Sequence, residues 1–234
     1  MKTYMKYALV AAAMLSIPTA NATLMQVEAT GTIYSGYDYS NALGSGVGNL
    51  NGQTITSTWT FDTDNLPNDY YGGSYTNTAY YHDNSDWITS TITVSGGGNT
   101  FDEDTQVDDA TNEADYLYLQ DNQYGYDHYQ IYSYSYDNSP YEYFYNYAYI
   151  YEYIDDIVQG LGADQTFDWT NNDSSDYGYG YFSLYEANPY ENAHGSYNIS
   201  HMSASVVTAV PEPSTFALFC LGLAGLYRVR KNNV

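Results

Sequence analysis

The chain has 234 residues and a net charge of −23, because 28 acidic residues face only five Lys and Arg. This excess of negative charge repels the phosphates of DNA and RNA and excludes a nucleic-acid partner. The single cysteine, Cys220, excludes disulfides and thiolate metal sites from the rest of the chain. All five basic residues lie within the first six or the last seven positions, so both ends differ from the acidic part between them.

The N-terminus has the three regions of a secretory signal peptide in order. Residues 1–6 are basic, an apolar stretch follows up to Pro18, and Ala20 and Ala22 form a small-x-small cleavage site. We therefore predict a signal-peptide helix at residues 1–22, export through the Sec machinery, and cleavage by signal peptidase after Ala22. An uncleaved anchor or a buried helix is the alternative.

Residues 23–209 are predicted to form one all-β domain, an antiparallel β-sandwich or jelly roll. Apolar and polar residues alternate with a period of two in several stretches, as in half-buried strands. Threonines occupy alternate positions in QTITSTWTF and in WITSTITV, so each of these strands has a threonine side. Turns rich in Gly, Asn and Asp separate the strands. The predicted strands cover residues 25–36, 53–61, 87–94, 178–187 and 195–207.

The stretch YEYFYNYAYIYEYI, residues 141–154, has a tyrosine at every odd position up to Tyr153. A similar alternating run precedes it, and the turn between the runs is expected around Asn138 and Ser139. A hairpin centred there places all these tyrosines on one side of the sheet as cross-strand aromatic pairs. Phe144 and Ile150 then face the core. The pairs predicted from this centre are Tyr136 with Tyr141, Tyr134 with Tyr143 and Tyr132 with Tyr145.

Three explanations of the tyrosine side remain open at this point. Exposed rings can stack on sugar rings, which makes Tyr143, Tyr145 and Tyr147 candidates for a polysaccharide site. Without basic residues, the body suits a neutral polysaccharide better than an acidic one. Alternatively, tyrosine is simply a favoured strand residue with a polar tip. The third explanation is calcium-dependent self-association, since long alternating strands tend to pair and cations would relieve the repulsion between copies.

No catalytic residue is predicted. The chain has no GxSxG motif and no Gly-rich loop followed by lysine, and its four histidines fall in no recognisable catalytic motif. The many carboxylates form so many pairs that none stands out as a glycosidase pair. We therefore expect a protein that is not an enzyme.

Acidic stretches raise the question of a metal site. Residues 101–115 contain seven acids, and residues 61–69 are similar, but neither has the spacing of a helix–loop–helix calcium site. We predict no metal ligand and no cofactor, with bound Ca²⁺ as the alternative. Any buried carboxylate must instead be met by backbone N–H, tyrosine, histidine or a cation, because the body has no Lys or Arg.

Residues 210–234, VPEPSTFALFCLGLAGLYRVRKNNV, combine three features in order. The tripeptide Pro211, Glu212, Pro213 comes first and holds the backbone extended. An apolar stretch at residues 216–227 predicts a hydrophobic helix that enters the inner membrane. The basic end should stay on the cytoplasmic side and help the short helix to reach across. Its basic residues are Arg228, Arg230 and Lys231.

This tail resembles the PEP-CTERM sorting signal of Gram-negative bacteria that make extracellular polysaccharide. The resemblance rests on Val210 to Thr215, on LGLAGL at residues 221–226 and on the basic end. It implies recognition by exosortase, a membrane peptidase that cuts near the Pro-Glu-Pro. The chain is then exported, transiently held in the inner membrane, and delivered to the cell surface or the extracellular matrix. An association with exopolysaccharide and biofilm is implied for the body.

Overall fold

The computed structural model describes residues 23–70, 77–95, 97, 99–102, 112–123, 125–138, 141–153, 155–187 and 190–207. The predicted signal peptide and sorting tail, with the two helices expected in them, lie outside these residues. The same holds for the predicted cleavage site, the Pro-Glu-Pro and the basic end. Within the described residues, no helix has the length and apolar character needed to cross a membrane.

The body, residues 23–207, is built from strands that join into one antiparallel sheet, which confirms the all-β prediction. The only helical element among the described residues is the short 3₁₀ turn η1, Thr63–Asn65. All five predicted strands are present. The strands are β1 Leu24–Asp38, β2 Gly48–Asn49, β3 Thr54–Asp62, β4 Thr78–Asp83, β5 Ile88–Val94, β6 Thr100–Asp102, β7 Asn112–Glu113, β8 Asp115–Gln123, β9 Tyr126–Asn138, β10 Tyr141–Glu152, β11 Phe167–Thr170, β12 Tyr177–Ala187 and β13 Tyr190–Val207.

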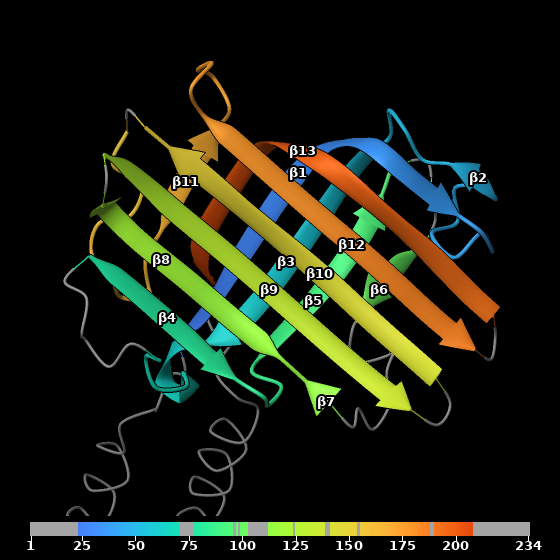
Figure 1. Ribbon diagram of the computed structural model, residues 1–234, viewed down its shortest axis with the longest axis horizontal. Helices are drawn as coiled ribbons and strands as arrows, with labels where there is room; N and C mark the ends of the chain where they lie inside the picture. The colour runs from blue at the N-terminus through green and yellow to red at the C-terminus, as the bar shows by residue number, and fades with distance from the viewer. Residues whose placement is uncertain are drawn as a thin grey trace, which may run out of the picture. The chain divides into compact units, whose positions relative to one another are not determined.

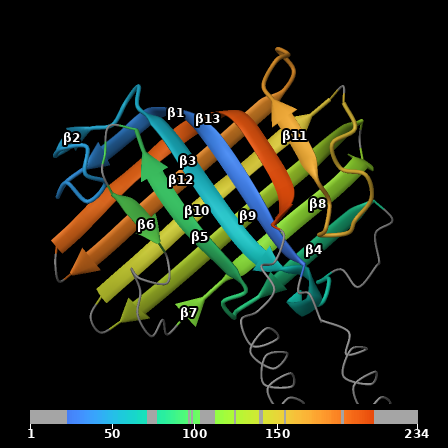
Figure 2. The ribbon, with the colours of Figure 1, turned by 180° about the vertical axis from the view of Figure 1, so that it is seen from behind.

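The sheet folds over on itself into two layers (Figures 1 and 2). Its strand order is β4-β8-β9-β10-β12-β13-β1-β3-β5-β6. We call β4, β8, β9, β10 and β12 the first layer, and β3, β5 and β6 the second. The long strands β13 and β1 run from one layer to the other. β13 pairs first with β12 and later with β11, and β1 has two register shifts, which are bulges that bend a strand.

The two layers pack face to face as in a β-sandwich. The hydroxyl of Tyr197 on β13 donates to Oγ of Ser57 on β3 at 3.0 Å. Ser90 and Ser133 connect β5 with β9 through their hydroxyls at 2.5 Å. Apolar side chains of both layers are buried between them, and the predicted inward residues Phe144 and Ile150 are among these. The threonines of β3 and β5 alternate with these buried positions and therefore lie on the other side of the second layer.

Glycines leave room for large aromatic rings between the layers. A Cβ atom at Gly180 would lie 2.0 Å from Cζ of Tyr197, and one at Gly195 would lie 2.7 Å from Cε1 of Phe182. Since no real Cβ contact is that short, the aromatic rings occupy the space that side chains would need. The GYGY sequence of β12 thus provides room for the fully buried Tyr197.

The predicted hairpin of β9 and β10 forms, but its predicted register is wrong. Asn138 lies opposite Tyr141, so that Tyr136 faces Tyr143, Tyr134 faces Tyr145 and Tyr132 faces Tyr147. The described strands pair up to Asn138 and Tyr141, whereas a turn centred between Asn138 and Ser139 would have ended the pairing at Asp137 and Pro140. Because the shift is two residues, every side chain keeps its predicted side of the sheet.

Candidate functional site

The outer side of the first layer is covered by tyrosines, and we call it the tyrosine face. Side chains alternate along each strand, so the residues between the buried positions point outward. Figure 1 looks onto this layer, and no described segment crosses in front of it. The tyrosines of this face are Tyr80, Tyr116, Tyr118, Tyr126, Tyr132, Tyr134, Tyr136, Tyr141, Tyr143, Tyr145, Tyr147, Tyr149, Tyr151, Tyr177, Tyr179, Tyr181 and Tyr185.

The rings of the tyrosine face contact one another from strand to strand. One continuous path runs from β4 to β12, and most of its contacts are tilted or edge-to-face. Such pairs add about 0.5–1.5 kcal/mol each beyond their buried area. Neighbouring rings therefore hold one another in place. The centroid distances along this path are 5.5 Å for Tyr80–Tyr116, 4.7 Å for Tyr116–Tyr132, 4.9 Å for Tyr132–Tyr145 and 5.3 Å for Tyr145–Tyr181.

The tyrosine face is free of charged side chains along β8, β9, β10 and β12. Every Asp and Glu in the described parts of these strands occupies one of the alternate positions whose side chains point to the inner side of the layer. Several are almost fully buried at the strand ends. These are Asp115, Asp127, Asp137, Glu142 and Glu152, each at most 8% exposed. In a chain with a net charge of −23, this is an unusual separation of acids from one whole side of a sheet.

The phenols of the face also stay neutral. Burial raises the pKa of Tyr132, Tyr147 and Tyr149 far above that of free tyrosine, and the neighbouring tyrosines add to the increase. Burial raises the pKa of Tyr145 as well. The face therefore offers uncharged rings and hydroxyl groups at any ordinary pH.

The sequence-predicted candidates Tyr143, Tyr145 and Tyr147 lie together in the middle of the tyrosine face. They are half-buried, because neighbouring rings from β9 and β12 pack against them. The contribution of β12 to the tyrosine face was not predicted. All tyrosines of its sequence YGYGYFSLY lie at odd-numbered positions, and this alternation was the signal available in the sequence.

Buried carboxylates in this chain are held by backbone N–H groups, as expected for a body without Lys or Arg. Asp38 accepts from Ser40, Ala42 and Leu43 at 3.1, 3.0 and 2.9 Å. Asp115 accepts from the N–H groups of Trp87 and Ile88, both at 2.9 Å. These acids therefore fix the loops beside the strands on which they lie.

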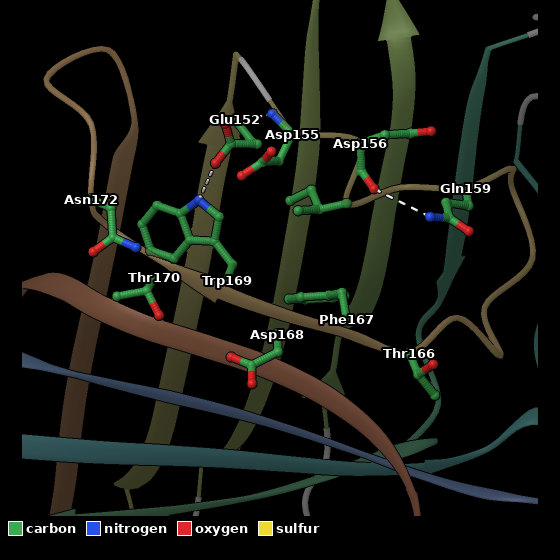
Figure 3. A pocket seen from close by; sticks show the side chains of 11 residues that line it. Glu152, Asp155, Asp156, Gln159, Thr166, Phe167, Asp168, Trp169, Thr170 and Asn172 are labelled. Carbon is green, nitrogen blue, oxygen red and sulfur yellow. Dashed lines mark hydrogen bonds between the residues drawn. The ribbon is translucent and has the colours of Figure 1, made fainter.

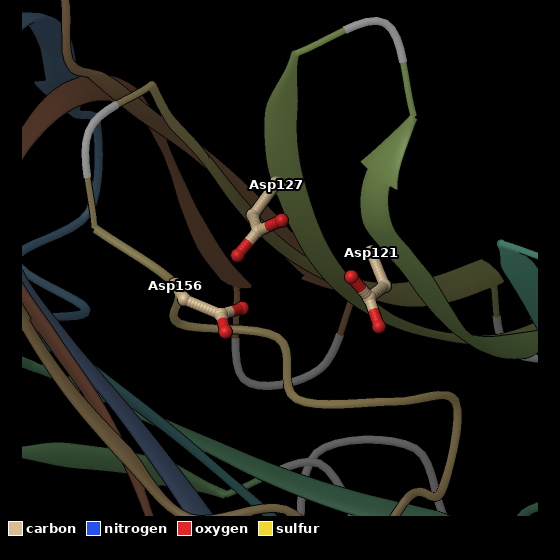
Figure 4. A group of neighbouring side chains, drawn as sticks. All are labelled: Asp121, Asp127 and Asp156. Atoms are coloured by element: carbon tan, nitrogen blue, oxygen red, sulfur yellow. The ribbon is translucent and has the colours of Figure 1, made fainter.

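Three acids from separate parts of the chain form a cluster at one end of the first layer (Figure 4). Oxygens of Asp121, Asp127 and Asp156 lie within 4.8 Å of one another, a spacing that could hold a cation. Both oxygens of Asp127 already accept backbone N–H groups, and Asp121 accepts from Gly160 at 3.0 Å. The cluster thus fastens the segment after β10, which is a structural role.

None of the described residues of the acidic stretches singled out from the sequence belongs to this cluster. Most of residues 101–115 lie outside the described residues. In residues 61–69, Asp62 caps η1 by accepting from the N–H of Asp64 at 2.9 Å, and Asp69 accepts from the N–H of Tyr80 at 3.0 Å.

A pocket of about 340 Å³ lies between the end of β10 and β11 (Figure 3). Glu152, Asp155, Asp156 and Asp168 line it, so that it disfavours anionic ligands. Glu152 is 2% exposed and accepts from the indole N–H of Trp169 at 2.7 Å. The indole hydrogen bond and the backbone N–H of Asp155 account for both oxygens of Glu152.

An all-β body with an uncharged aromatic side, followed by a tail with a Pro-Glu-Pro, indicates an exported protein with a C-terminal sorting signal. The family model of the PEP-CTERM protein-sorting motif matches residues 209–231, which confirms the resemblance of the tail. The chain is therefore a PEP-CTERM protein, exported and processed to the cell surface through recognition by exosortase. Among curated proteins, the comparison found no match to the chain.

Proposed function

We propose that this protein is a non-enzymatic component of the surface or extracellular matrix of a Gram-negative bacterium, and that it binds a neutral polysaccharide through the tyrosine face. The observation that carries the proposal is the continuous, uncharged aromatic side of the first layer. The sorting motif supports the location, because exosortase processing delivers the body to the outside of the cell.

Sugar rings have two kinds of surface, and the tyrosine face offers a partner for each. The C–H groups of a pyranose stack on an aromatic ring, while its hydroxyl groups bond to phenols and to the amide of the partly exposed Gln130 on the same face. An acidic polysaccharide would instead be repelled by the net negative charge of the body.

The tyrosine face is also preorganised for binding. Each ring in its middle already contacts several others, so little side-chain freedom remains to be lost when a ligand binds. A flat polysaccharide can contact many rings at once, and many weak contacts along one chain then add up.

Processing of the chain is proposed to follow the order of its segments. Signal peptidase removes residues 1–22, the apolar tail holds the protein in the inner membrane, and exosortase cuts near Pro211. Deletion of residues 210–234 should abolish the membrane-held precursor. If the mature ends and the location of the protein stay the same after the deletion, this order of events is wrong.

A sedimentation assay with insoluble polysaccharide tests the binding proposal. Cellulose serves as the neutral probe and calcium alginate as the acidic one. The protein should be retained on cellulose, and Tyr145→Ala combined with Tyr181→Ala should weaken retention about tenfold or more, since each stacked ring is worth of the order of 1 kcal/mol. The matched control is Thr58→Ala with Thr91→Ala on the opposite side of the body, which should leave binding unchanged.

The same assay separates the rival explanations. Equal loss in both double variants, or equal retention on cellulose and alginate, would argue against a glycan site on the tyrosine face. Calcium-dependent self-association predicts instead that the protein sediments without any polysaccharide when calcium is added. An enzyme would release soluble sugars, which mass spectrometry of the supernatant detects.

A further inference from the structure

Two strongly exposed tyrosines flank Tyr185 at one end of the tyrosine face. Tyr141 on β10 is 51% exposed, and Tyr190 on β13 is 55% exposed. The ring centroid of Tyr185 lies 5.3 Å from that of Tyr141 and 5.9 Å from that of Tyr190. Tyr141 also contacts Tyr136 and Tyr143, so this end is joined to the rest of the tyrosine face.

Tyrosine is the oxidisable side chain that the described body offers to its surroundings. Met25, Met202 and Trp59 are fully buried, Trp169 is 2% exposed, and Trp87 is only partly exposed. The single cysteine of the sequence lies in the sorting tail, outside the body. Apart from the partly exposed Trp87, the readily oxidised side chains that the described body offers to an oxidant are therefore tyrosines.

The arrangement of the face directs oxidation toward its exposed end. A tyrosyl radical forms when a phenol loses one electron and one proton. Buried phenols such as Tyr132 and Tyr147 give up the proton less readily, because burial raises their pKa. Exposed phenols release it to water. Since neighbouring rings are in contact, an electron can pass along the face until the radical rests on an exposed ring.

We propose that Tyr141 and Tyr185 are an oxidative coupling site, at which a haem peroxidase with hydrogen peroxide forms a dityrosine bond between β10 and β12. Each phenol loses one electron and one proton, which reduce one hydrogen peroxide to two waters. The two radicals then join through ortho carbon atoms, and the ring hydrogens return to the phenol oxygens as the rings become aromatic again.

Tyr185 has two further ring neighbours, Tyr143 and Tyr190. The pair with Tyr141 is favoured over the first because Tyr143 is less exposed than Tyr141, and over the second by the length of the loop that the bond closes. Tyr185 and Tyr190 belong to the single β12–β13 hairpin, where a bond would close only a short loop. Tyr141 and Tyr185 lie on adjacent strands with most of β10 and the whole of residues 153–176 between them. A bond that closes this longer loop restricts the unfolded chain more, as a disulfide does. The exposure of Tyr141 gives its ring room to turn toward Tyr185.

The experiment treats the purified full chain with a haem peroxidase and hydrogen peroxide at low protein concentration. Dityrosine fluorescence should develop, the intact monomer should lose the mass of two hydrogen atoms, and the midpoint of thermal unfolding should rise by several degrees. Cleavage after glutamate suits this body, which has no Lys or Arg. It yields peptides 114–142, 153–186 and 187–191, which carry Tyr141, Tyr185 and Tyr190 separately.

The expected product joins peptide 114–142 to peptide 153–186. Tyr141→Phe should abolish this product, whereas the matched variant Tyr190→Phe, which removes the other exposed neighbour, should retain it. Both variants must unfold at the same temperature before oxidation, which shows that they are folded. The proposal is overturned if the product persists in Tyr141→Phe, if peptide 187–191 is the main partner, or if cross-links form only between copies.

Discussion

The N–H groups of Ile157 and Val158 both donate to Oδ2 of Asp127, at 2.9 and 3.0 Å. The other oxygen, Oδ1, accepts from the N–H of Asn122 at 2.7 Å, and the side chain is only 3% exposed. A buried anion thus serves as the fastening point of two backbone segments. In most proteins Lys or Arg would share this role, but this body has neither.

Replacement of Asp127 should therefore be costly. Asp127→Ala leaves three N–H groups in a buried setting without acceptors, and each unsatisfied group costs about 1–3 kcal/mol. We expect the free energy of unfolding to fall by about 3 kcal/mol or more in urea denaturation. Asp156→Asn is the matched control, because Asp156 belongs to the same cluster but is exposed, and it should change stability by less than about 0.5 kcal/mol. Similar losses in both variants would contradict this account.

Removal of divalent cations should not change the stability of the body. Because N–H groups already occupy the oxygens of Asp127, the cluster with Asp121 and Asp156 does not need a cation to be stable. Thermal unfolding with EDTA and with excess calcium should have the same midpoint within about 1 °C, which for a body of this size corresponds to well under 1 kcal/mol. A rise with calcium that disappears in Asp121→Asn would show that a cation contributes.

His128 should make the protein sensitive to mild acid. Its ring is 7% exposed and stacks on Tyr151 at 4.2 Å, and burial lowers its pKa from 6.5 to about 4. The unfolded chain then binds a proton more readily than the folded one. Stability due to the neutral ring is complete above pH 6.5 and is lost as the pH falls toward 4, by about 3 kcal/mol in total.

The variant His128→Phe keeps an aromatic ring at this position and removes the titration. Urea denaturation at pH 7 and pH 4 should show a smaller loss of stability for the variant than for the unchanged protein. The carboxylates titrate in both proteins, so the difference between them isolates His128. Equal losses would show that His128 is protonated without cost in the folded state.

Gly180 should not accept even one methyl group. Its Cβ would collide with the buried ring of Tyr197, and overpacking of this kind costs about 1–3 kcal/mol. We expect Gly180→Ala to lower the thermal midpoint and Tyr197→Phe to lower it less, since the latter loses only the hydrogen bond to Ser57. In the double variant with Tyr197→Leu, the cost of Gly180→Ala should shrink. Full additivity of the two changes would exclude this contact as the cause.

The hydroxyl and the ring of Tyr145 should make separable contributions to polysaccharide binding. Tyr145→Phe keeps the stacking surface, so retention on cellulose should fall only about two- to fivefold, the loss expected for one hydrogen bond. Tyr145→Ala removes both the ring and the hydroxyl, so retention on cellulose should fall further. If the two variants bind equally, the ring itself does not contact the ligand.

The sides of the sheet could be predicted from the sequence because alternation alone decides them. In β10, the period of two placed Phe144 inside and Tyr145 outside without knowledge of any partner strand. The register with β9 depended on the position of one turn, and a shift of the partner residue by two was invisible to the pattern. The side was therefore predicted correctly and the directly opposite partners were not, although the rings of the predicted pairs Tyr136–Tyr141 and Tyr132–Tyr145 are in diagonal contact.

The acid cluster could not be predicted because its members come together only in the folded chain. Asp121, Asp127 and Asp156 belong to β8, β9 and the segment after β10. A partial signal did exist. Asp127 lies between two outward-facing positions near the start of β9, so its side chain is expected to point toward the core. A carboxylate at such a position must find donors, although the sequence does not say which.

The pairing of β1 with β13 has a consequence for the time at which the body can fold. Leu24 lies opposite Val207, so the first strand of the body needs the last one as its neighbour. Both strands also connect the two layers, so the connection through β1 and β13 cannot form until β13 is available. Contacts between such distant parts of a chain make folding slow. The body therefore cannot complete its sheet before its C-terminal strand is present.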